Sequence, residues 1–383
     1  MHTAQFHWQP EGGWTPALPE APLTGASGFA LAFGMREAIT EARRAELRAV
    51  VGDLPLVWCT TSGEIAGEGV HDGTIVFTTV RFARAGVRAH QVTLDGTADS
   101  RAAGRLLAGR FGASTEAGAL RHVLVFSDGL AVNGTGLVAG LADSLPAGVT
   151  LTGGLAGDGA QFSQTLVGLG DDLAAGSLVA VGIYGDSVQV GFGSMGGWDA
   201  FGPERHVDQS AGNVLHRLDG EPALEVYKRY LGGHAAGLPG SALLFPLAVT
   251  APGAKGAVTR TILAVDEATG SMTFAGDVPE GAKVRLMKAN HDRLVDGAEG
   301  AAGLCVDAAG KGPDFALLIS CVGRKLVMGQ RVEEEVEAVA AALGAGTTLT
   351  GFYSYGELAP RSLGAACELH NQTMTVTTFR EAH

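Results

Sequence analysis

Three stretches of the chain repeat the same order of hydrophobic and polar positions. In the first stretch, apolar residues between positions 35 and 50 follow helical spacing, and Gly52 ends the pattern. An apolar run at 54–59 then predicts a strand, and a short polar loop that ends in Glu64 follows it. The β-branched run at 74–80 predicts a second strand that pairs with a neighbour. The repeated unit is therefore a helix, a strand, a loop that carries glycine and an acid, and another strand.

The same order returns twice, each time with a buried-looking strand in front of the helix. The second copy is predicted to contain a helix at 136–145, N-capped by Asn133, and strands at 123–126, 150–152, 163–167 and 178–184. The third copy is predicted to contain a helix at 333–343 and strands at 315–321, 347–350 and 374–379. The three copies share one plan.

The spacing of the three loop acids predicts two halves. Asp158 and Glu357 are about twice as far apart as Glu64 and Asp158, so we expect a fourth, degenerate unit between them, with its loop near 273–277. Short turns between strands imply antiparallel pairing, whereas helical crossovers imply parallel pairing. We therefore predict an α/β (α+β) fold of two related halves, built from repeated helix-strand-loop-strand units in mixed sheets covered by helices.

Composition indicates a globular chain that carries its own hydrophobic cores. The 383 residues are 46% hydrophobic and 17% charged, which suits two domains. No apolar run approaches the roughly 18 residues that would span a bilayer, and the first residues lack the pattern of a signal peptide. The four cysteines (Cys59, Cys305, Cys321 and Cys367) form no Cys-x-x-Cys pair. We expect a cytoplasmic protein with reduced thiols and no membrane insertion.

The charge balance argues against nucleic acid as a partner. The formal net charge is -13, which repels a phosphate backbone unless a basic patch intervenes. The densest basic segments, at 36–48 and 324–331, mix their basic residues with acids or apolar positions. They are typical of solvated faces.

The three loops combine small residues with one acid at a fixed place. Small residues let backbone amides approach a guest, and hydroxyls and carboxylates near strand ends suit a polar small-molecule pocket better than a catalytic centre. Simple turn chemistry is an equally good interpretation for Thr60, Thr61, Ser62, Glu64 and Asp158. The loops read Cys59-Thr60-Thr61-Ser62-Gly63-Glu64, Gly153-Gly154-Leu155-Ala156-Gly157-Asp158 and Gly351-Phe352-Tyr353-Ser354-Tyr355-Gly356-Glu357.

These loops, with further motifs in the same order, resemble the FIST family, a family of sensory domains. The resemblance covers nearly the whole chain and implies an N-terminal FIST domain at 28–217 and a C-terminal one at 218–383. Residues 1–27 are rich in Pro, Gly and Trp without periodicity, which predicts an extended arm before these domains. The further motifs are Ser127-Asp128-Gly129, Gly196-Gly197-Trp198, Gly212-Asn213-Val214-Leu215, Pro222-Ala223-Leu224, Phe245-Pro246-Leu247, Gly276-Asp277-Val278-Pro279, Ser320-Cys321-Val322-Gly323-Arg324 and Leu369-His370-Asn371-Gln372-Thr373.

The resemblance implies a non-enzymatic intracellular sensor that binds a small ligand such as an amino acid. Some relatives are described as haem-binding nitric-oxide sensors that act on a histidine kinase. Because the family pattern takes up the chain, the signal is expected to pass to a separate partner protein, with a histidine kinase as the candidate. No cofactor is required in this interpretation, and haem is the alternative.

An amino acid would suit the residues of the third loop. Glu357 can hold an ammonium group, and Arg324 can hold a carboxylate in a bidentate fork. Aromatic faces and hydroxyls can cover and orient the rest of the ligand. The competing interpretation is that these groups cap turns, pack in the core and pair with acids of the chain. The predicted ligand-binding residues are Thr60, Thr61, Ser62, Glu64, Gly153, Gly154, Asp158, Arg324, Tyr353, Ser354, Tyr355, Glu357, His370 and Asn371.

Some polar or aromatic residues are expected to have structural roles. His370 is better explained as a buried, hydrogen-bonded histidine than as a ligand contact. Asp128 and Asn133 are expected to serve as turn and cap residues, and Trp198 as an aromatic that packs at the hinge.

Other site chemistries find less support in the sequence. Gly191-x-Gly193-x-x-Gly196 matches a dinucleotide fingerprint, but the residues after it do not open a helix. No paired spacing predicts a metal site. A hydrolase would use Ser62, Ser127 or Ser354 with His370, yet no Gly-x-Ser-x-Gly elbow is present. A structural scaffold is the third class. An axial haem ligand needs no local motif, which leaves His206, His216, His234, His291 and His370.

Overall fold

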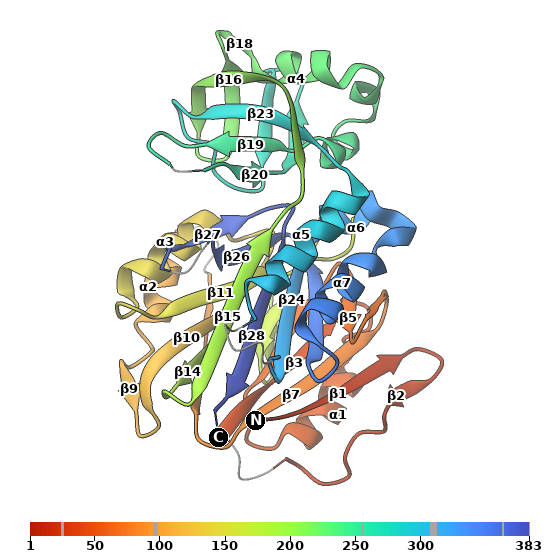
Figure 1. Cartoon of the computed structure of the whole chain (residues 1–383), viewed down its shortest axis with the longest axis vertical. Coiled ribbons are helices and arrows are strands. Elements are labelled where there is room, and N and C mark those ends of the chain that lie inside the picture. The colour runs from red at the N-terminus through yellow and green to blue at the C-terminus, as the bar shows by residue number, and fades with distance from the viewer. Residues whose placement is uncertain (24–26, 95–98, 255, 307–311, 362–363, 383) are drawn as a thin grey trace.

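The computed structural model describes residues 1–23, 27–94, 99–254, 256–306, 312–361 and 364–382. They form a large body of three β-sheets with helices on the outside, and a smaller domain that stands on one end of this body (Figure 1). The chain enters the small domain after β15 (Val188–Met195) and leaves it before α5 (His291–Gly303). Both termini lie at the opposite end of the body (Figure 1).

The body is built from three copies of one strand-helix-strand unit. In each copy the two strands pair in parallel, and a third strand pairs antiparallel with the first. The first copy is β3 (Ser27–Gly34), α1 (Glu41–Val51), β4 (Leu56–Thr60) and β7 (Ile75–Phe82). The second is β10 (Gly118–Ser127), α3 (Gly134–Ser144), β11 (Thr150–Leu155) and β14 (Ser177–Tyr184). The third is β24 (Phe315–Cys321), α7 (Glu333–Leu343), β25 (Thr348–Ser354) and β28 (Met374–Glu381).

The three units exchange strands, so that each sheet contains strands of more than one unit. After the Gly-acid loop, a short strand joins the sheet of another unit: β5 (Glu64–Ala66) pairs with β25, β12 (Val167–Leu169) with β4, and β26 (Gly356–Pro360) with β11. Longer strands make the remaining exchanges: β8 (Gly86–Thr93) pairs with β14, and β15 pairs with β28. The N-terminal strand β1 (His2–Gln9) extends the first unit's sheet by pairing with β7. The units are therefore interlocked by backbone hydrogen bonds.

Five short strands complete the three sheets. They lie at sheet edges or beside β10, and they are β2 (Gly13–Thr15), β6 (Gly69–His71), β9 (Ser114–Thr115), β13 (Asp172–Ala174) and β27 (Cys367–His370). The predicted arm at 1–27 thus supplies β1 and β2 to the first sheet. Its residues 24–26 lie outside the described part of the chain.

An aromatic cluster occupies the centre of the body. Phe33 of β3, Phe126 of β10 and Phe352 of β25 are fully buried in the core that the three sheets share. Their ring centroids lie 4.8 Å (Phe33 to Phe352), 5.8 Å (Phe33 to Phe126) and 6.4 Å (Phe126 to Phe352) apart. These are distances at which aromatic rings attract one another, so each unit contributes one ring to the same contact.

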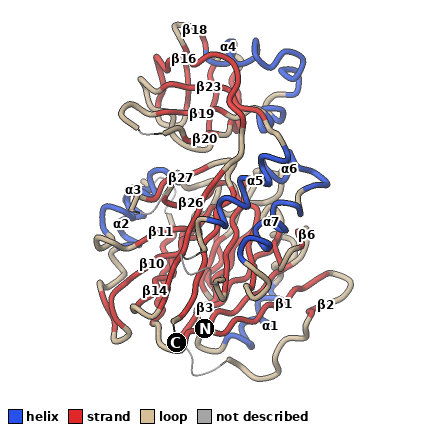
Figure 2. The backbone as a smooth tube through the Cα atoms, in the orientation of Figure 1, coloured by secondary structure: helices blue, strands red, loops and turns tan. Residues whose placement is uncertain are grey.

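Helices cover the outer faces of the sheets (Figure 2). α1 covers the first sheet, α3 and α2 (Ser100–Ala108) cover the second, and α5 and α7 cover the third. α6 (Val322–Met328) follows β24 at the end that faces the small domain. None of the helices that the structure describes has both the length and the apolar character needed to cross a membrane.

The small domain has an antiparallel sheet and its own hydrophobic core. Its helices are α4 (Ala223–Leu231) and the 3-10 helices η1 (Gly232–Gly237) and η2 (Gly240–Leu244). Its strands are β16 (Asp199–Ala211), β17 (Val214–Leu218), β18 (Glu221–Pro222), β19 (Leu247–Thr250), β20 (Val258–Arg260), β21 (Ile262–Asp266), β22 (Ser271–Phe274) and β23 (Lys283–Lys288).

The predicted fold class is confirmed, with corrections of detail. The fold is mixed α/β, with repeated units and helices that cover the sheets. The fourth unit is not formed, since the pairings described between residues 199 and 288 are all antiparallel. The third unit returns to the body because β24, β25 and β28 find partners there, so the sequence halves are not separate bodies in space. Residues 163–166 form a loop, and the strand begins at Val167.

The close approach of β10 and β11 requires glycine at position 153. A Cβ added to Gly153 would lie 1.9 Å from the backbone oxygen of Val125, and the φ of Gly153 is +154°. Neither backbone can move without breaking the ladder. We expect Gly153→Ala to lower the free energy of unfolding by roughly 3 kcal/mol, as overpacking does. Gly346→Ala, at a loop glycine with nothing within 4 Å of its added Cβ, is the matched control. Equal urea-unfolding midpoints for the two variants would contradict the requirement for glycine at position 153.

Candidate ligand-binding site

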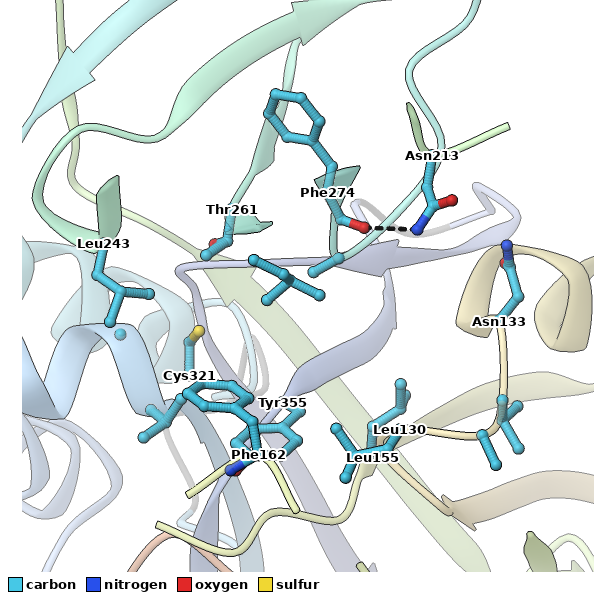
Figure 3. A pocket seen from close by; sticks show the side chains of 17 residues that line it. Leu130, Asn133, Leu155, Phe162, Asn213, Leu243, Thr261, Phe274, Cys321 and Tyr355 are labelled. Atoms are coloured by element: carbon cyan, nitrogen blue, oxygen red, sulfur yellow. Dashed lines mark hydrogen bonds between the residues drawn. The ribbon is translucent and has the colours of Figure 1, made fainter. Parts of the chain in front are cut away.

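A pocket of about 300 Å³ lies between the body and the small domain, near the low end of the ~300–1,000 Å³ range of ligand pockets. Loops of the body that follow β10, β11, β24 and β25 form one side, and the small domain forms the other (Figure 3). The carboxyl ends of parallel strands are where α/β sheets usually bind ligands. The lining residues are Gly129, Leu130, Ala131, Val132, Asn133, Leu155, Phe162, Asn213, Leu243, Thr261, Leu263, Phe274, Ala275, Cys321, Val322, Gly323 and Tyr355.

Asp128 and Asn133 shape the loop that follows β10. The carboxylate of Asp128 accepts hydrogen bonds from the backbone N–H groups of Leu130 (2.8 Å), Ala131 (2.6 Å) and Gly176 (2.9 Å). The Asn133 side chain caps α3 by accepting from Gly136 N–H at 3.0 Å, and it donates to Asp277 of the small domain at 3.2 Å. Both have the turn and cap roles that their sequence context predicts, and Asn133 also lines the pocket.

Two stacked aromatic rings form part of the body side of the pocket. The Phe162 and Tyr355 rings lie 4.6 Å apart at an interplanar angle of 12° (Figure 3). Asp158 holds both residues, because one of its oxygens accepts from Phe162 N–H (2.9 Å) and from the Tyr355 hydroxyl. The other oxygen accepts from Ser163 and Gln164 N–H groups, each at 2.8 Å. Asp158 therefore positions the aromatic pair and lies beneath it.

Left-handed backbone occurs at two points around the pocket. Phe162 has a φ of 50° and Gln372 a φ of 63°, values that cost energy for residues with a side chain. The Gln372 side chain packs against Gly323 of the pocket lining, where an added Cβ would lie 2.3 Å from its Nε2 atom. Nε2 donates to the Leu243 carbonyl of the small domain at 3.4 Å. Such strain persists where surrounding structure holds it, often at ligand sites.

The small domain contributes polar groups as well as apolar ones to its side of the pocket. Asn213 donates to the Phe274 carbonyl at 2.8 Å (Figure 3). Thr261 is only 4% exposed, and its hydroxyl has no hydrogen-bond partner among the described residues. A buried polar group without a partner calls for an explanation, and a bound molecule is one.

The acids of the first and third loops are buried in matching networks. Glu64 accepts from the hydroxyl of Thr61, three residues before it, and from the backbone (3.2 Å) and hydroxyl (2.7 Å) of Thr74. Glu357 accepts from Ser354, also three residues before it, at 2.7 Å, and from the backbone (3.2 Å) and hydroxyl (2.9 Å) of Thr373. Both residues are fully buried, and neither lines the pocket. Each acid thus ties its loop to a strand that comes later in the chain.

Burial separates the pKa values of the three loop acids. Burial is the main cause that raises the pKa of Glu64 to about 7 and that of Glu357 to about 8, and the hydrogen bonds that each acid accepts offset it only in part. Burial acts on Asp158 too, but its hydrogen bonds from Tyr355, Gln164 and Ser163 outweigh it and leave the pKa below its usual range. Asp158 is therefore the acid that stays ionised.

Arg324 does hold a carboxylate, but it is the carboxylate of Glu335. The two side chains are completely buried, with Arg324 Nη2 2.7 Å from Glu335 Oε2. Arg324 also donates to the carbonyls of Gly196 and Leu294, and Glu335 accepts from Tyr353 at 2.8 Å. In this conformation the guanidinium is therefore engaged by α5, α7 and the segment that leads into the small domain, rather than by the pocket.

The other predicted residues lie beneath the pocket or away from it. Thr60 bonds to Leu166 N–H (2.9 Å), Ser62 to Gly159 (3.1 Å), and His370 to the Ala359 carbonyl (3.0 Å). Burial lowers the pKa of His370 to about 4, which fits the buried role expected of it. An added Cβ on Gly154 would meet Ile319 at 2.6 Å. Asn371 is fully buried, and both polar atoms of its amide lack a partner among the described residues.

Of the predicted ligand-binding residues, the structure thus brings only Tyr355 into the pocket lining. Sequence reasoning did not select the residues of the small domain, Phe162 or Leu130 as ligand contacts. A signal was present for Asn213 and Ala275, which lie in or next to the motifs Gly212-Asn213-Val214-Leu215 and Gly276-Asp277. Phe162 and Thr261 carry no such signal, since their positions depend on tertiary contacts.

The residues around the pocket do not fit haem. No histidine lines it. Its two side chains that can ligate haem iron are Cys321 and Tyr355, and burial raises the pKa of both, which disfavours the anionic forms that bind iron. The histidines that remained as axial candidates all lie outside the lining: His206, His216, His234, His291 and His370. No cluster of metal-ligating side chains occurs among the described residues.

Fold and site together define a class of protein: a two-part module with a ligand-sized pocket between its parts and no assembled catalytic group in the pocket lining. The family of this module follows from comparison with known families. The FIST N domain matches residues 28–221, and the FIST C domain matches residues 223–360. The chain belongs to the FIST family, whose domains are associated with sensory signalling and small-ligand binding. A comparison with curated proteins gave no match.

Glu357 makes the stability of the fold depend on pH in a defined direction. Its folded pKa of about 8 exceeds the ordinary value of 4.5, so the folded state keeps a proton that the unfolded state loses. Stability is therefore lost as pH rises between these values, by up to roughly 4 kcal/mol. We expect Glu357→Gln to gain stability relative to wild type over this interval, measured by urea unfolding from about pH 5 to pH 9. Asp158→Asn is the control, because the depressed pKa of Asp158 places its titration below this interval, so its stability difference from wild type is expected to stay constant between about pH 5 and pH 9. Parallel curves for wild type and Glu357→Gln would refute the expectation.

The buried pair of Arg324 and Glu335 is expected to be essential for stability. Arg324→Met leaves the carboxylate of Glu335 buried without its cation, which costs roughly 3–5 kcal/mol. Arg331→Met removes an exposed pair with Glu334 and is expected to cost at most about 1 kcal/mol. Chemical unfolding of both variants checks the contrast, and a loss for Arg324→Met as small as that for Arg331→Met would contradict the essential role of the buried pair.

Proposed function

We propose that this FIST protein is a non-enzymatic intracellular sensor whose ligand binds between the body and the small domain. The observation that carries the proposal is that one pocket has walls from both parts of the molecule. A ligand that contacts both walls binds more tightly to the closed arrangement of the two parts than to a more open one. This difference in affinity sets how far the ligand shifts the equilibrium toward the closed arrangement. Ligand binding thereby becomes a change in the relative population of domain orientations.

Connections between the two parts support this coupling. Among the described residues, few direct hydrogen bonds link the two parts. They include Asn133 to Asp277, Gln372 to the Leu243 carbonyl, and Arg260 to the Leu369 carbonyl at 2.9 Å. Trp198, at the entry to the small domain, donates to the Gln372 carbonyl at 2.8 Å and packs with Leu294 and Met328. Trp198 thus packs at the entry to the small domain, which is the hinge role predicted for it. Gln372 contacts both Trp198 and Gly323 of the pocket lining.

The chemistry of the lining bears on which ligand is proposed. A free amino acid, the ligand that the sequence predicts, carries two charges that need partners. The side chains of the lining carry no charge at neutral pH, so they favour an uncharged molecule over a zwitterion. Turnover finds no support in the serines considered for a hydrolase, since Ser62, Ser127 and Ser354 bond to carbonyl oxygens or to Glu357.

The output of the sensor belongs to the proposal as well. A change of domain orientation alters the surface offered to a signalling partner, for which a histidine kinase is the candidate that the family resemblance implies. The four cysteines are free, which is compatible with the reducing cytoplasm as the place of action.

Filling the pocket tests the proposal. Ala275 lines the pocket, and Ala275→Trp is expected to abolish the thermal shift that a screen of metabolites produces with wild type, because the indole takes the space of the ligand. Ala268→Trp, at an exposed turn of the same small domain outside the lining, is the matched control and is expected to retain the shift. A ligand that stabilises both variants equally binds elsewhere and would rule out this pocket.

A further inference from the structure

Resting on the proposed function, we infer that the ligand is an uncharged, planar molecule with hydrogen-bonding edges, such as a heteroaromatic ring or an aryl amide. Three features of the pocket converge on this class: the absence of charge in its lining, the stacked aromatic pair on one side, and neutral polar groups on the other.

The first feature is electrostatic. None of the residues that line the pocket is an aspartate, glutamate, lysine, arginine or histidine. Charged groups beside the lining are committed to the protein: Asp128 bonds to backbone N–H groups, and Asp158 bonds to Phe162 and Tyr355. Arg260 donates to the carbonyls of Asp277, Thr259 and Leu369. A charged ligand would lose hydration without gaining a partner of opposite charge, which costs several kcal/mol.

The second feature is a flat aromatic surface. The Phe162 side chain is 39% exposed even though its ring stacks on Tyr355. The chain accepts a left-handed backbone at Phe162 and secures it with Asp158, which places a large apolar ring at the pocket instead of in the core. An aromatic ring presented in this way binds another planar ring by offset stacking or edge contact.

The third feature is the set of polar groups opposite the aromatic pair. The Thr261 hydroxyl lacks a partner among the described residues, and the amide nitrogen of Asn213 donates to the Phe274 carbonyl. Figure 3 shows Thr261 and Asn213 on the side of the pocket that faces Phe162 and Tyr355. A molecule between them presents a ring face to one side and a donor or acceptor edge to the other.

The test compares probes of one shape and different charge. Benzamide, benzoate and benzylammonium share the ring, and cyclohexanecarboxamide keeps the amide without the aromatic face; phenylalanine represents the zwitterion. Binding is followed by ligand-observed NMR titration of the full chain. We expect benzamide to bind at least about 10-fold more tightly than each charged probe, because the pocket offers a charge no partner.

Two substitutions connect binding to the named groups. Thr261→Val removes the hydroxyl and is expected to weaken benzamide binding about 5-fold, the value of one neutral hydrogen bond, without loss of fold stability. Phe162→Leu is expected to weaken benzamide by a similar factor of about 5 while leaving cyclohexanecarboxamide nearly unchanged. Leu106→Ala, at an exposed leucine outside the lining, is the control for unspecific effects.

The outcomes separate this inference from the proposed function. If a charged probe binds as tightly as benzamide and Ala275→Trp abolishes that binding, the pocket is a ligand site but the inferred class is overturned. Absence of benzamide binding also overturns the inferred class of ligand. The metabolite screen with Ala275→Trp then still tests whether the pocket is a ligand site. If Ala275→Trp changes the binding of no probe and of no metabolite, the proposed function itself falls.

Discussion

The architecture depends on the exchange of strands at the three Gly-acid loops. Each loop ends a parallel strand of one unit and feeds a short strand into the sheet of another, so backbone hydrogen bonds hold the three units together. Backbone groups in such a crossing are far from water and need partners inside the protein. Glu64 and Glu357 supply these partners for Thr74 and Thr373, and the cost of burying their carboxyl groups appears as raised pKa values.

The same crossings determine where the pocket lies. Because the loops leave the carboxyl ends of the parallel strands together, the body presents β10, β11, β24 and β25 to the small domain at one end. The second loop differs from the other two: its acid, Asp158, stays ionised and organises Phe162 and Tyr355 at the pocket surface instead of bonding within a buried crossing. The acid of the repeated loop therefore holds a buried strand crossing together in the first and third units, and positions pocket residues in the second unit.

The segment that leads into the small domain is anchored to the body. Arg324 and Glu335 are buried together and reach the carbonyl of Gly196, just before the chain enters the small domain. Hydrogen bonds between the two parts are few by comparison and lie around the pocket. Under the proposed function, a ligand in the pocket acts at this boundary between the two parts.

Local pattern in the sequence was sufficient for most of the elements and for the three repeats, but not for the fourth unit that it predicted. The apolar runs at β24 and β14, the helix α7 and the cap at Asn133 are specified by neighbours in the chain, and so are the three Gly-acid loops and the family to which the chain belongs. Tertiary structure alone decided the use of the polar residues. The sequence around a loop acid is the same whether the acid contacts a ligand or a threonine distant in sequence, as Glu357 contacts Thr373. In the same way, the sequence around Arg324 does not reveal that Glu335 is its partner. The pocket itself combines Phe162, Thr261 and Tyr355 from segments that meet only after the third unit has returned to the body, and no local pattern encodes that return because it depends on which sheet edges are open when the chain folds.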